Sequence, residues 1–500
     1  MSRSPSARAR IAAIVVLVLA LAPACSRTEQ APRPETSTPA VTTTAPPITA
    51  PVVPAGDFTP VVQLVDAAIA APRMPGAVVQ IGHAGKIVFR QAFGSRKLPG
   101  EPGLDGSPTP AEPMTEDTIF DLASLTKSLA TATAVLQLAE RGKVAIDEPL
   151  QTYLPEFNPT DNPRRAQVTL RMLLTHTSGI AGDLSLDGPW GLQQADKAEG
   201  IRRALNARLD FDPGQLFHYS DIGFILLGAM VEKITGEPQD VYARGNIFEP
   251  LDMTDTRYLP AATACGPYRV SGTALAFDPR APRAVDCPAD TWSTDVLARV
   301  APTARDEDTP GINPNIGRPL RGTVHDPTAR RMGGVAGSAG VFSTVRDLGL
   351  FAQALLDRLA GRPSEFPLTQ ASVELMTTPQ QPGHHSGQLD AANTAVRESI
   401  RTANTDPLLA VNYPAIPGQD LRGFGWDIDT ALSRPRGLIF PVGSFGQGGF
   451  TGVTLWIDPA SDSYVIVLAN VIHQRGGPPV VTLSGDIATT AARVLHLYGS

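Results

Sequence analysis

The alternation of hydrophobic and polar positions predicts β-strands near both ends of the chain. Residues 75–94, PGAVVQIGHAGKIVFRQAFG, have the pattern of two strands joined by a tight turn at Ala84–Gly85. Late in the chain, GVTLWIDP at 452–459 and SYVIVLAN at 463–470 have the same character, with turn residues between them. We therefore expect one sheet assembled from both ends of the chain.

Between and beside these strands, apolar residues recur at helical spacing. A first helix is predicted at 60–71 and a last one at 484–498. The strongest pattern covers 124–141, which is apolar on more than one face, as expected of a helix buried inside a domain. Residues 143–350 predict a mostly helical insertion, and the polar stretch 378–420 predicts a surface loop insertion. The fold class that follows is α+β, an antiparallel sheet flanked by helices.

The first 56 residues differ in composition from this folded part, which we expect at 57–500. Within 1–25, arginines precede a short apolar run, and small residues lead to Cys25, the layout of a secretory signal. The ending Ala-Pro-Ala-Cys resembles a bacterial lipoprotein signal, so we expect Cys25 to carry lipid, with ordinary cleavage as the alternative. The Pro/Thr-rich stretch 26–56 predicts an extended tether. The expected location is the cell envelope, in the periplasm or on the outer face of a membrane.

Composition then narrows the classes of partner. The chain has 500 residues and a formal net charge of −7, with no Lys/Arg-rich run beyond its N-terminus, so no nucleic-acid partner is expected. Cys265 and Cys287 predict one disulfide in an oxidising compartment, with two unpaired thiols as the alternative. No histidine lies close enough in sequence to these cysteines to complete a zinc-like spacing, so no metal site is expected there. No organic cofactor is expected either.

Candidate chemistry begins where the strongest helix pattern begins. Ser124 and Lys127 in SLTK are three apart, so on a helix they share a face and form either a nucleophile with its base or an ordinary helix start. Burial and a nearby positive group would be needed to keep Lys127 neutral. Two more stretches fit acyl transfer: Tyr219, whose phenol oxygen could relay a proton, and the Gly-rich 444–452, where backbone N–H groups could approach an oxyanion.

In this order, the three stretches resemble the penicillin-recognising serine hydrolases, in the branch of class C β-lactamases, D-alanyl-D-alanine carboxypeptidases and esterases. VTLRMLLTHTSGI at 168–180, the long stretch at 321–348 and Gly-Phe-Thr-Gly at 449–452 resemble the same family. The resemblance covers about residue 60 to the C-terminus. It implies a β-lactamase/transpeptidase-like fold and an exported serine hydrolase that forms a covalent acyl-enzyme.

Applied residue by residue, the resemblance implies Ser124 as the acylated nucleophile, Lys127 as its base and Tyr219 as the proton relay. Asp221 stands where the family's Tyr-x-Asn usually ends, and its negative charge would stabilise the protonated lysine. The backbone N–H groups of Ser124 and Phe450 would form the oxyanion hole.

One motif departs from the family pattern. Where Lys-Thr-Gly or His-Thr-Gly is usual, this chain has Gln447, Gly448 and Gly449. Gln447 donates hydrogen bonds but supplies no charge, so a substrate carboxylate would be held less firmly. No residue corresponds to the separate deacylating glutamate of class A enzymes. The expected substrates are a β-lactam, a D-Ala-D-Ala peptide of the peptidoglycan type or a small ester.

Several alternatives stay open at this point. Ala336–Gly340 approximates a Gly-x-Ser-x-Gly nucleophile elbow, for which His473 or His496 would have to supply the histidine. For His176, a structural hydrogen-bonding role is favoured over that of a catalytic base. For the pair His325-Asp326, a role in fixing a loop is favoured over that of a catalytic pair. The non-enzymatic alternative is a tethered penicillin-binding or cell-wall sensing module with little or no turnover.

Overall fold

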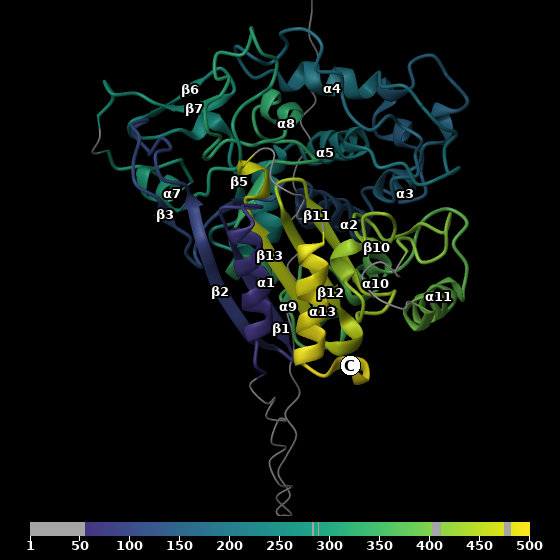
Figure 1. The fold of residues 1–500 in the computed structure, drawn as a ribbon. Helices are drawn as coiled ribbons and strands as arrows, with labels where there is room; N and C mark the ends of the chain where they lie inside the picture. Colours follow the sequence, from purple (N-terminus) through teal and green to yellow (C-terminus); the bar gives the residue numbers. More distant parts are fainter. Residues whose placement is uncertain (1–55, 283–284, 289, 403–411, 475–481) are drawn as a thin grey trace, which may run out of the picture. The chain divides into compact units, whose positions relative to one another are not determined.

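A computed structural model describes residues 56–282, 285–288, 290–402, 412–474 and 482–500 (Figure 1). The predicted signal segment, Cys25 and all but the last residue of the predicted tether lie outside these ranges. In the part of the chain that is described, no helix is both long and apolar enough to cross a membrane.

The main sheet joins the two ends of the folded part, as predicted. It has eight antiparallel strands in the order β3-β2-β1-β13-β12-β11-β10-β9. At its centre the first strand pairs with the last one, with Val79 opposite Val467. The strand bounds are β1 Gly76–His83, β2 Lys86–Lys97, β3 Glu112–Pro113, β9 Leu421–Arg422, β10 Asp427–Asp429, β11 Phe445–Gly449, β12 Val453–Asp458 and β13 Ser463–Ala469.

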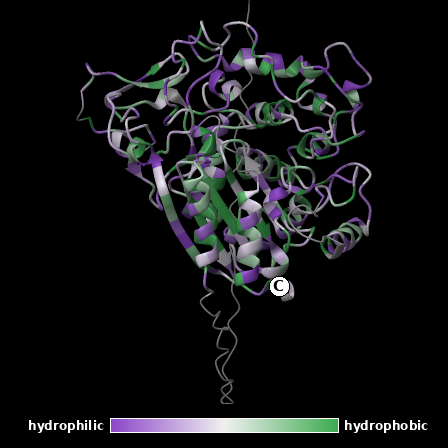
Figure 2. Ribbon diagram, in the orientation of Figure 1, coloured by the Kyte–Doolittle hydropathy of each residue, from purple (hydrophilic) through white to green (hydrophobic). Residues whose placement is uncertain are grey.

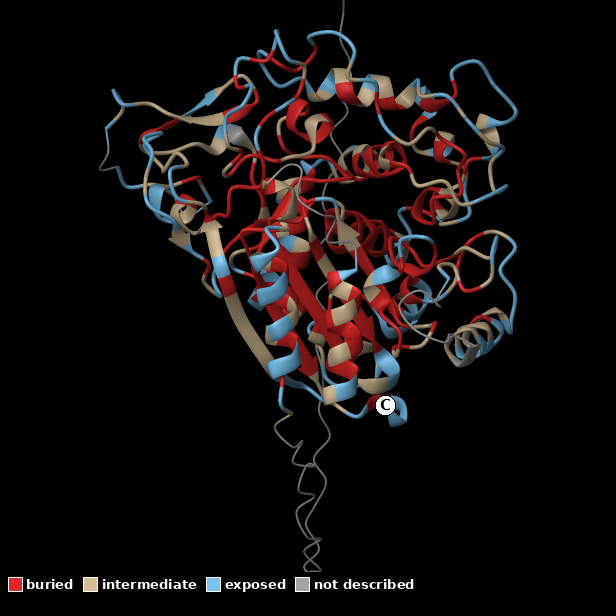
Figure 3. Ribbon diagram, viewed as in Figure 1, coloured by how far each residue is buried: buried red, intermediate tan, exposed pale blue. Residues whose placement is uncertain are grey.

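Helices cover both faces of this sheet because both faces are apolar (Figure 2). Val79 and Val467 belong to a core beneath α1 (Thr59–Ala70) and α13 (Leu483–Val494), which lie side by side over one face (Figure 1). Val78 and Leu468, the next pair in register, belong to the larger core on the opposite face, where α9 (Val345–Leu359) packs. The central strands β1 and β13 are buried, β2 is mostly of intermediate burial, and the outer sides of α1 and α13 are exposed (Figure 3).

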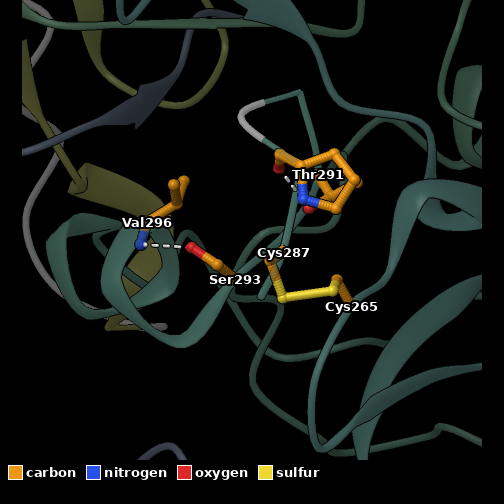
Figure 4. The surroundings of a disulfide bond; sticks show 6 residues. Cys265, Cys287, Thr291, Ser293 and Val296 are labelled. Carbon is orange, nitrogen blue, oxygen red and sulfur yellow. Dashed lines mark hydrogen bonds between the residues drawn. A yellow bond between two sulfur atoms is a disulfide. The ribbon is translucent and has the colours of Figure 1, made fainter. Parts of the chain in front are cut away.

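Between β3 and β9 the chain forms the predicted, mostly helical insertion, together with two small sheets in the orders β4-β8-β5 and β6-β7. Cys265 and Cys287 form a disulfide near the start of α7, where the Ser293 hydroxyl accepts a hydrogen bond from the Val296 N–H (Figure 4). The bounds are β4 Phe120–Asp121, η1 Lys127–Ala132, α2 Thr133–Glu140, α3 Leu170–Leu174, α4 Lys197–Leu205, α5 Asp221–Thr235, α6 Gln239–Ala243, β5 Arg257–Tyr258, β6 Tyr268–Ser271, β7 Ala274–Phe277, α7 Thr294–Arg299, α8 Pro327–Arg331, β8 Val341–Ser343, α10 Gln370–Thr377 and α11 Gln388–Thr402.

The structure differs from the sequence prediction in the helix expected at 124–141. Its first part, η1, is a π-helix, and only α2 is α-helical. The Thr131 hydroxyl donates to the Gly337 carbonyl at 2.7 Å, and the Ser128 hydroxyl donates to the Gly425 carbonyl at 2.6 Å. These contacts tie the first turns to distant segments, and π-helical turns of this kind are frequent at functional sites.

The predicted loop insertion at 378–420 was also wrong in part, because it contains α11. Leu389, Ala392 and Val396 lie at helical spacing on this helix; Ala392 is fully buried and the other two pack partly buried against the core. A single apolar stripe on an otherwise polar segment is too weak a signal to predict a helix from sequence. The helix is stabilised mainly by the packing of this stripe against the core.

Candidate active site

Ser124 lies at a sharp turn between β4 and η1. The preceding residue, Ala123, has a φ of 45°, a left-handed conformation that a side chain seldom adopts. The Asp121 carboxylate holds this turn, because it accepts hydrogen bonds from the Ala123 N–H at 2.9 Å and the His325 N–H at 2.7 Å. Burial raises the pKa of Asp121 to about 6, although the two backbone N–H groups oppose the rise. The turn presents the Ser124 hydroxyl toward Lys127.

The Lys127 ammonium is almost completely buried and has three partners. Its Nζ lies 3.0 Å from Ser124 Oγ, 2.9 Å from the Ser338 carbonyl oxygen and 2.6 Å from Asp221 Oδ1. Burial alone would lower the pKa of Lys127, but the Asp221 carboxylate and Tyr219 together outweigh burial, and the net pKa is raised above its ordinary value. Lys127 is therefore protonated at neutral pH in the resting site.

Tyr219 forms the wall beside this ammonium. Lys127 Nζ lies 5.1 Å from the centroid of the Tyr219 ring, which stacks on His176 with the two centroids 4.2 Å apart. His176 Nδ1 accepts a hydrogen bond from the Ser220 N–H at 3.1 Å, and burial holds the pKa of His176 well below its usual value. His176 is thus a neutral, structural ring that positions Tyr219.

Asp221 owes its position to the start of α5. Ser220 caps this helix, since its hydroxyl accepts from the Gly223 N–H at 3.1 Å and donates to the Ala181 carbonyl at 2.7 Å. The Asp221 N–H donates to the Gly182 carbonyl at 2.8 Å. The carboxylate at the first position of α5 is thereby directed at Lys127, with its side chain 19% exposed.

The end of β11 lies directly against the turn that carries Ser124. A Cβ added to Gly449 would lie 2.5 Å from the Leu122 carbonyl oxygen, so only glycine permits this approach. The Thr451 hydroxyl donates to the Asp121 carbonyl at 2.8 Å. Within the described ranges, neither the Ser124 N–H nor the Phe450 N–H donates a hydrogen bond. Both N–H groups are thus available to an oxyanion.

Gln447 lies beside Tyr219. Its Nε2 lies 3.4 Å from the Tyr219 hydroxyl and 3.2 Å from the Gly448 carbonyl oxygen, and the side chain is buried. Gly448 has only ordinary van der Waals neighbours at the position of a Cβ. The structure therefore brings together all the residues that the sequence analysis placed in the catalytic and oxyanion sites, which are Ser124, Lys127, Tyr219, Asp221, Gln447, Gly448, Gly449 and Phe450.

The alternative nucleophile elbow at Ala336–Gly340 is not assembled. The Ser338 side chain is fully buried, and its carbonyl is occupied by Lys127. The His473 ring bonds instead to the Pro302 carbonyl at 2.9 Å and to Glu101 at 2.8 Å. This segment therefore serves the Ser124 site as a backbone acceptor.

His325 and Asp326 do not form a catalytic pair either. The His325 ring stacks on Phe450 at a centroid distance of 5.7 Å, and burial lowers its pKa to about 4. The Asp326 carboxylate caps α8 by accepting from the Ala329 N–H at 2.6 Å. Among the described residues, no group of three His, Cys, Asp or Glu side chains could hold a metal ion.

Asp121 and the Ser338 carbonyl were missed by sequence reasoning, although both shape the site. Asp121 lies three residues before Ser124, and an aspartate just before a sharp turn is a recognised turn signal. The Ser338 contact has no sequence signal, since it uses a backbone carbonyl 211 residues away from Lys127.

The Asp221→Asn substitution tests the electrostatics of Lys127. If neutral Lys127 is the base, kcat/KM rises with pH as the ammonium loses its proton, and the raised pKa places that rise at alkaline pH. Removing the Asp221 charge lowers the pKa of Lys127, so we expect the rise to move about one to three pH units lower. A pH–rate profile of both proteins measures this, and an unmoved profile would show that another group is the base.

Comparisons with known proteins identify the family of this chain. The family model described as Beta-lactamase matches residues 61–478. A "Putative D-alanyl-D-alanine carboxypeptidase" from Escherichia coli K12 is 27% identical over 79% of this chain and 78% of its own length. Esterase EstB from Burkholderia gladioli is 36% identical over 39% of this chain and 50% of its own length.

Solved structures show the same fold. The crystal structure of a class C beta lactamase from Rhodobacter sphaeroides has a TM-score of 0.52 and 20% sequence identity, and the match covers 86% of this chain and 99% of that one. This match confirms the predicted α+β, β-lactamase-like fold. The chain therefore belongs to the beta-lactamase family and is a serine hydrolase of the β-lactamase and D-alanyl-D-alanine peptidase type.

Proposed function

We propose that this protein hydrolyses small ester or amide bonds through a covalent acyl-enzyme on Ser124. The observation that carries the proposal is the 3.0 Å contact between Ser124 Oγ and the buried Lys127 Nζ, beside the backbone N–H groups of Ser124 and Phe450, which have no acceptor in the described part of the chain. A serine hydroxyl needs such a base, and a tetrahedral intermediate needs such donors.

The reaction proceeds in two halves. Lys127 in its neutral form takes the proton from Ser124 Oγ as this oxygen bonds to the substrate carbonyl carbon, and the N–H groups of Ser124 and Phe450 stabilise the oxyanion. Tyr219 passes the proton to the leaving group as its bond to carbon breaks. A water molecule then attacks the acyl carbon, gives a proton back through the same groups and releases the acid and free Ser124.

The charges of the site favour substrates that do not depend on a carboxylate. Gln447 is uncharged where the family usually has a cation, and Asp221 adds a negative charge where Asn is usual. The similarity to an esterase over part of the chain agrees with a small ester as substrate. The similarity to a protein named as a carboxypeptidase keeps D-Ala-D-Ala peptides as a second substrate class.

The Gln447→His substitution tests how the site treats carboxylates. A protonated imidazole would supply the missing cation, so we expect kcat/KM for a carboxylate-bearing ester to rise about tenfold at pH 6 relative to that for a neutral ester. The gain should fade at pH 8, because an ordinary imidazole is then neutral. Gln447→Leu, which has neither charge nor amide, is the control and should show no gain. An unchanged ratio in Gln447→His would mean that carboxylates are not bound at this position.

The proposed function is tested by intact-protein mass and product formation together. The protein is mixed with p-nitrophenyl acetate or with a penicillin, with Ser124→Ala alongside. Released p-nitrophenol that depends on Ser124 supports the hydrolase. A lasting penicillin adduct without ester turnover would favour the second candidate, a penicillin-binding or cell-wall sensing module, for which the uncharged Gln447 is the motivating observation.

We also propose that the protein is exported and held at the cell envelope by lipid on Cys25. The support is the sequence alone: the basic start, the apolar run, the cysteine and the Pro/Thr-rich stretch after it. Metabolic labelling with a palmitate analogue tests the anchor. Label that disappears in Cys25→Ser supports it, and an unlabelled, released protein with a cleaved leader supports ordinary secretion.

A further inference from the structure

The two proposed oxyanion donors belong to segments that are far apart in sequence. One is the Ser124 N–H, in the turn after β4, and the other is the Phe450 N–H, in the turn after β11. An oxyanion is stabilised fully only when both N–H groups reach the same oxygen atom, each at about 2.7–3.1 Å. The position of one turn relative to the other is therefore part of the chemistry, and contacts between the two turns have to fix it.

Asp121 holds the first of these turns through its carboxylate. Oδ1 accepts a hydrogen bond from the Ala123 N–H at 2.9 Å, and Oδ2 accepts one from the His325 N–H at 2.7 Å. Ala123 has a left-handed φ of 45°, and the bond to Oδ1 stabilises this conformation directly before Ser124. The carboxylate thus fixes the backbone that carries the first donor.

The same residue also holds the second turn, by two routes. Its backbone carbonyl accepts from the hydroxyl of Thr451, the neighbour of Phe450, at 2.8 Å. Its carboxylate fixes the backbone of His325, whose ring stacks on the Phe450 ring with the two planes 20° apart. Phe450 is 74% exposed, so the core contributes little to its position and these contacts contribute much.

A buried carboxylate without an ion pair is costly, and here its charge has a specific use. Asp121 is 2% exposed, and Arg330, whose charge acts on it, is paired with Asp306 at 2.9 Å. Hydrogen bonds to an ionised acceptor are stronger than those to a neutral one. An asparagine would accept through one oxygen only, because its NH2 group would face the other backbone N–H. The charge therefore allows one side chain to hold two backbone segments at once.

From this arrangement we infer that Asp121 is the positioning residue of the oxyanion hole, because it sets the place of the Ser124 N–H relative to the Phe450 N–H. The inference rests on the proposed acyl-enzyme function and adds a residue that acts on the tetrahedral intermediate through both donors. Asp121 takes no part in the bond changes at Ser124. Its loss should slow acyl transfer more than it weakens substrate binding, since the donors act most strongly in the transition state.

The test compares Asp121→Asn with the parent protein in single turnovers, with protein in excess over p-nitrophenyl acetate at pH 8. At this pH the Asp121 carboxylate is ionised, because its pKa is about 6. We expect the limiting rate of p-nitrophenol release to fall about 10²-fold, as a small displacement of an oxyanion donor would cause. The protein concentration that gives half of this rate should change by less than about threefold.

A thionoester separates the positioning of the donors from a general loss of structure. In p-nitrophenyl thionoacetate, sulfur replaces the carbonyl oxygen and accepts hydrogen bonds only weakly. If Asp121 acts through the donors, the oxygen-to-sulfur ratio of acylation rates falls about tenfold in Asp121→Asn. Equal slowing of both esters would overturn the inference and leave the proposed function standing. Absence of Ser124-dependent acylation in the parent protein would overturn both.

Two further variants keep the test decisive. Thr451→Val removes the hydroxyl that binds the Asp121 carbonyl but keeps the carboxylate, so it should lower the oxygen-to-sulfur ratio about two- to tenfold. If Asp121→Asn does not fold, an unchanged ratio in Thr451→Val overturns the inference. Asp347→Asn is the matched control, because the Asp347 carboxylate is fully buried on α9 and accepts from the Asp255 N–H at 2.8 Å. It should lose stability and keep the ratio of the parent protein, and an equal fall in this control would also contradict the inference.

Discussion

Ser124→Ala is expected to lower kcat/KM for p-nitrophenyl acetate by at least about 10⁴-fold and to abolish acylation by any substrate. Without Oγ no covalent intermediate can form, and what remains is catalysis by the oxyanion donors and by binding alone. The measurement is steady-state hydrolysis together with intact-protein mass. Because Ser124 is at a turn held by the Asp121 carboxylate and not by its own side chain, the variant should fold normally.

The matched control for this variant is Ser128→Ala, on the same helical segment. The Ser128 hydroxyl is buried and donates to the Gly425 carbonyl at 2.6 Å, so its loss should lower the free energy of unfolding by about 1 kcal/mol or more. Among the described residues its hydroxyl bonds to Gly425 and not to Ser124, Lys127 or Tyr219, and we expect the kcat/KM of the variant to stay within about tenfold of that of the parent. Should Ser124→Ala retain most of the activity, or both variants lose it equally, Ser124 would not be the nucleophile.

The sheet and the helices at both ends of the folded part could be predicted from sequence because their signals are local. The hairpin turn is an example, since Ala84 and Gly85 both have positive φ, as a tight turn between paired strands requires. The order of motifs then placed Ser124, Lys127 and Tyr219 in one site. The match to known family members supplied this order, and no single motif would have been specific enough.

What could not be predicted depends on contacts between distant segments. The π-helical start of the catalytic helix accompanies hydrogen bonds from Ser128 and Thr131 to residues 297 and 206 positions away in sequence. The protonation state of Lys127 could not be predicted for the same reason, because it depends on a contact with a distant segment. Sequence reasoning allowed a lysine kept neutral by burial, and only the close approach of Asp221, at 2.6 Å, and of Tyr219 shows that the pKa of Lys127 is raised in spite of burial.

Because Lys127 is the proposed base of Ser124, the Lys127→Met substitution is expected to have the second large effect on activity. The substitution keeps the length and burial of the side chain but removes the amine that lies 3.0 Å from Ser124 Oγ and is positioned to take its proton, so we expect kcat/KM to fall about 10³-fold, within the usual range for loss of a general base. It also leaves Asp221 without its ion-pair partner, and the free energy of unfolding should fall with it. Hydrolysis of p-nitrophenyl acetate and thermal unfolding measure the two effects separately.

Two further variants separate chemistry from stability in this experiment. Lys127→Met combined with Asp221→Asn removes both charges, so it should recover part of the stability but none of the activity. Lys97→Met is the control for burying a methionine in place of a lysine. Lys97 is also fully buried, but within the described ranges its acceptors are backbone carbonyls, those of Leu98, Glu101, Thr109 and Pro110. It should lose stability and keep its activity. Activity restored by the double variant would instead show that Lys127 serves only to neutralise Asp221, and that the proton of Ser124 leaves through Tyr219 alone.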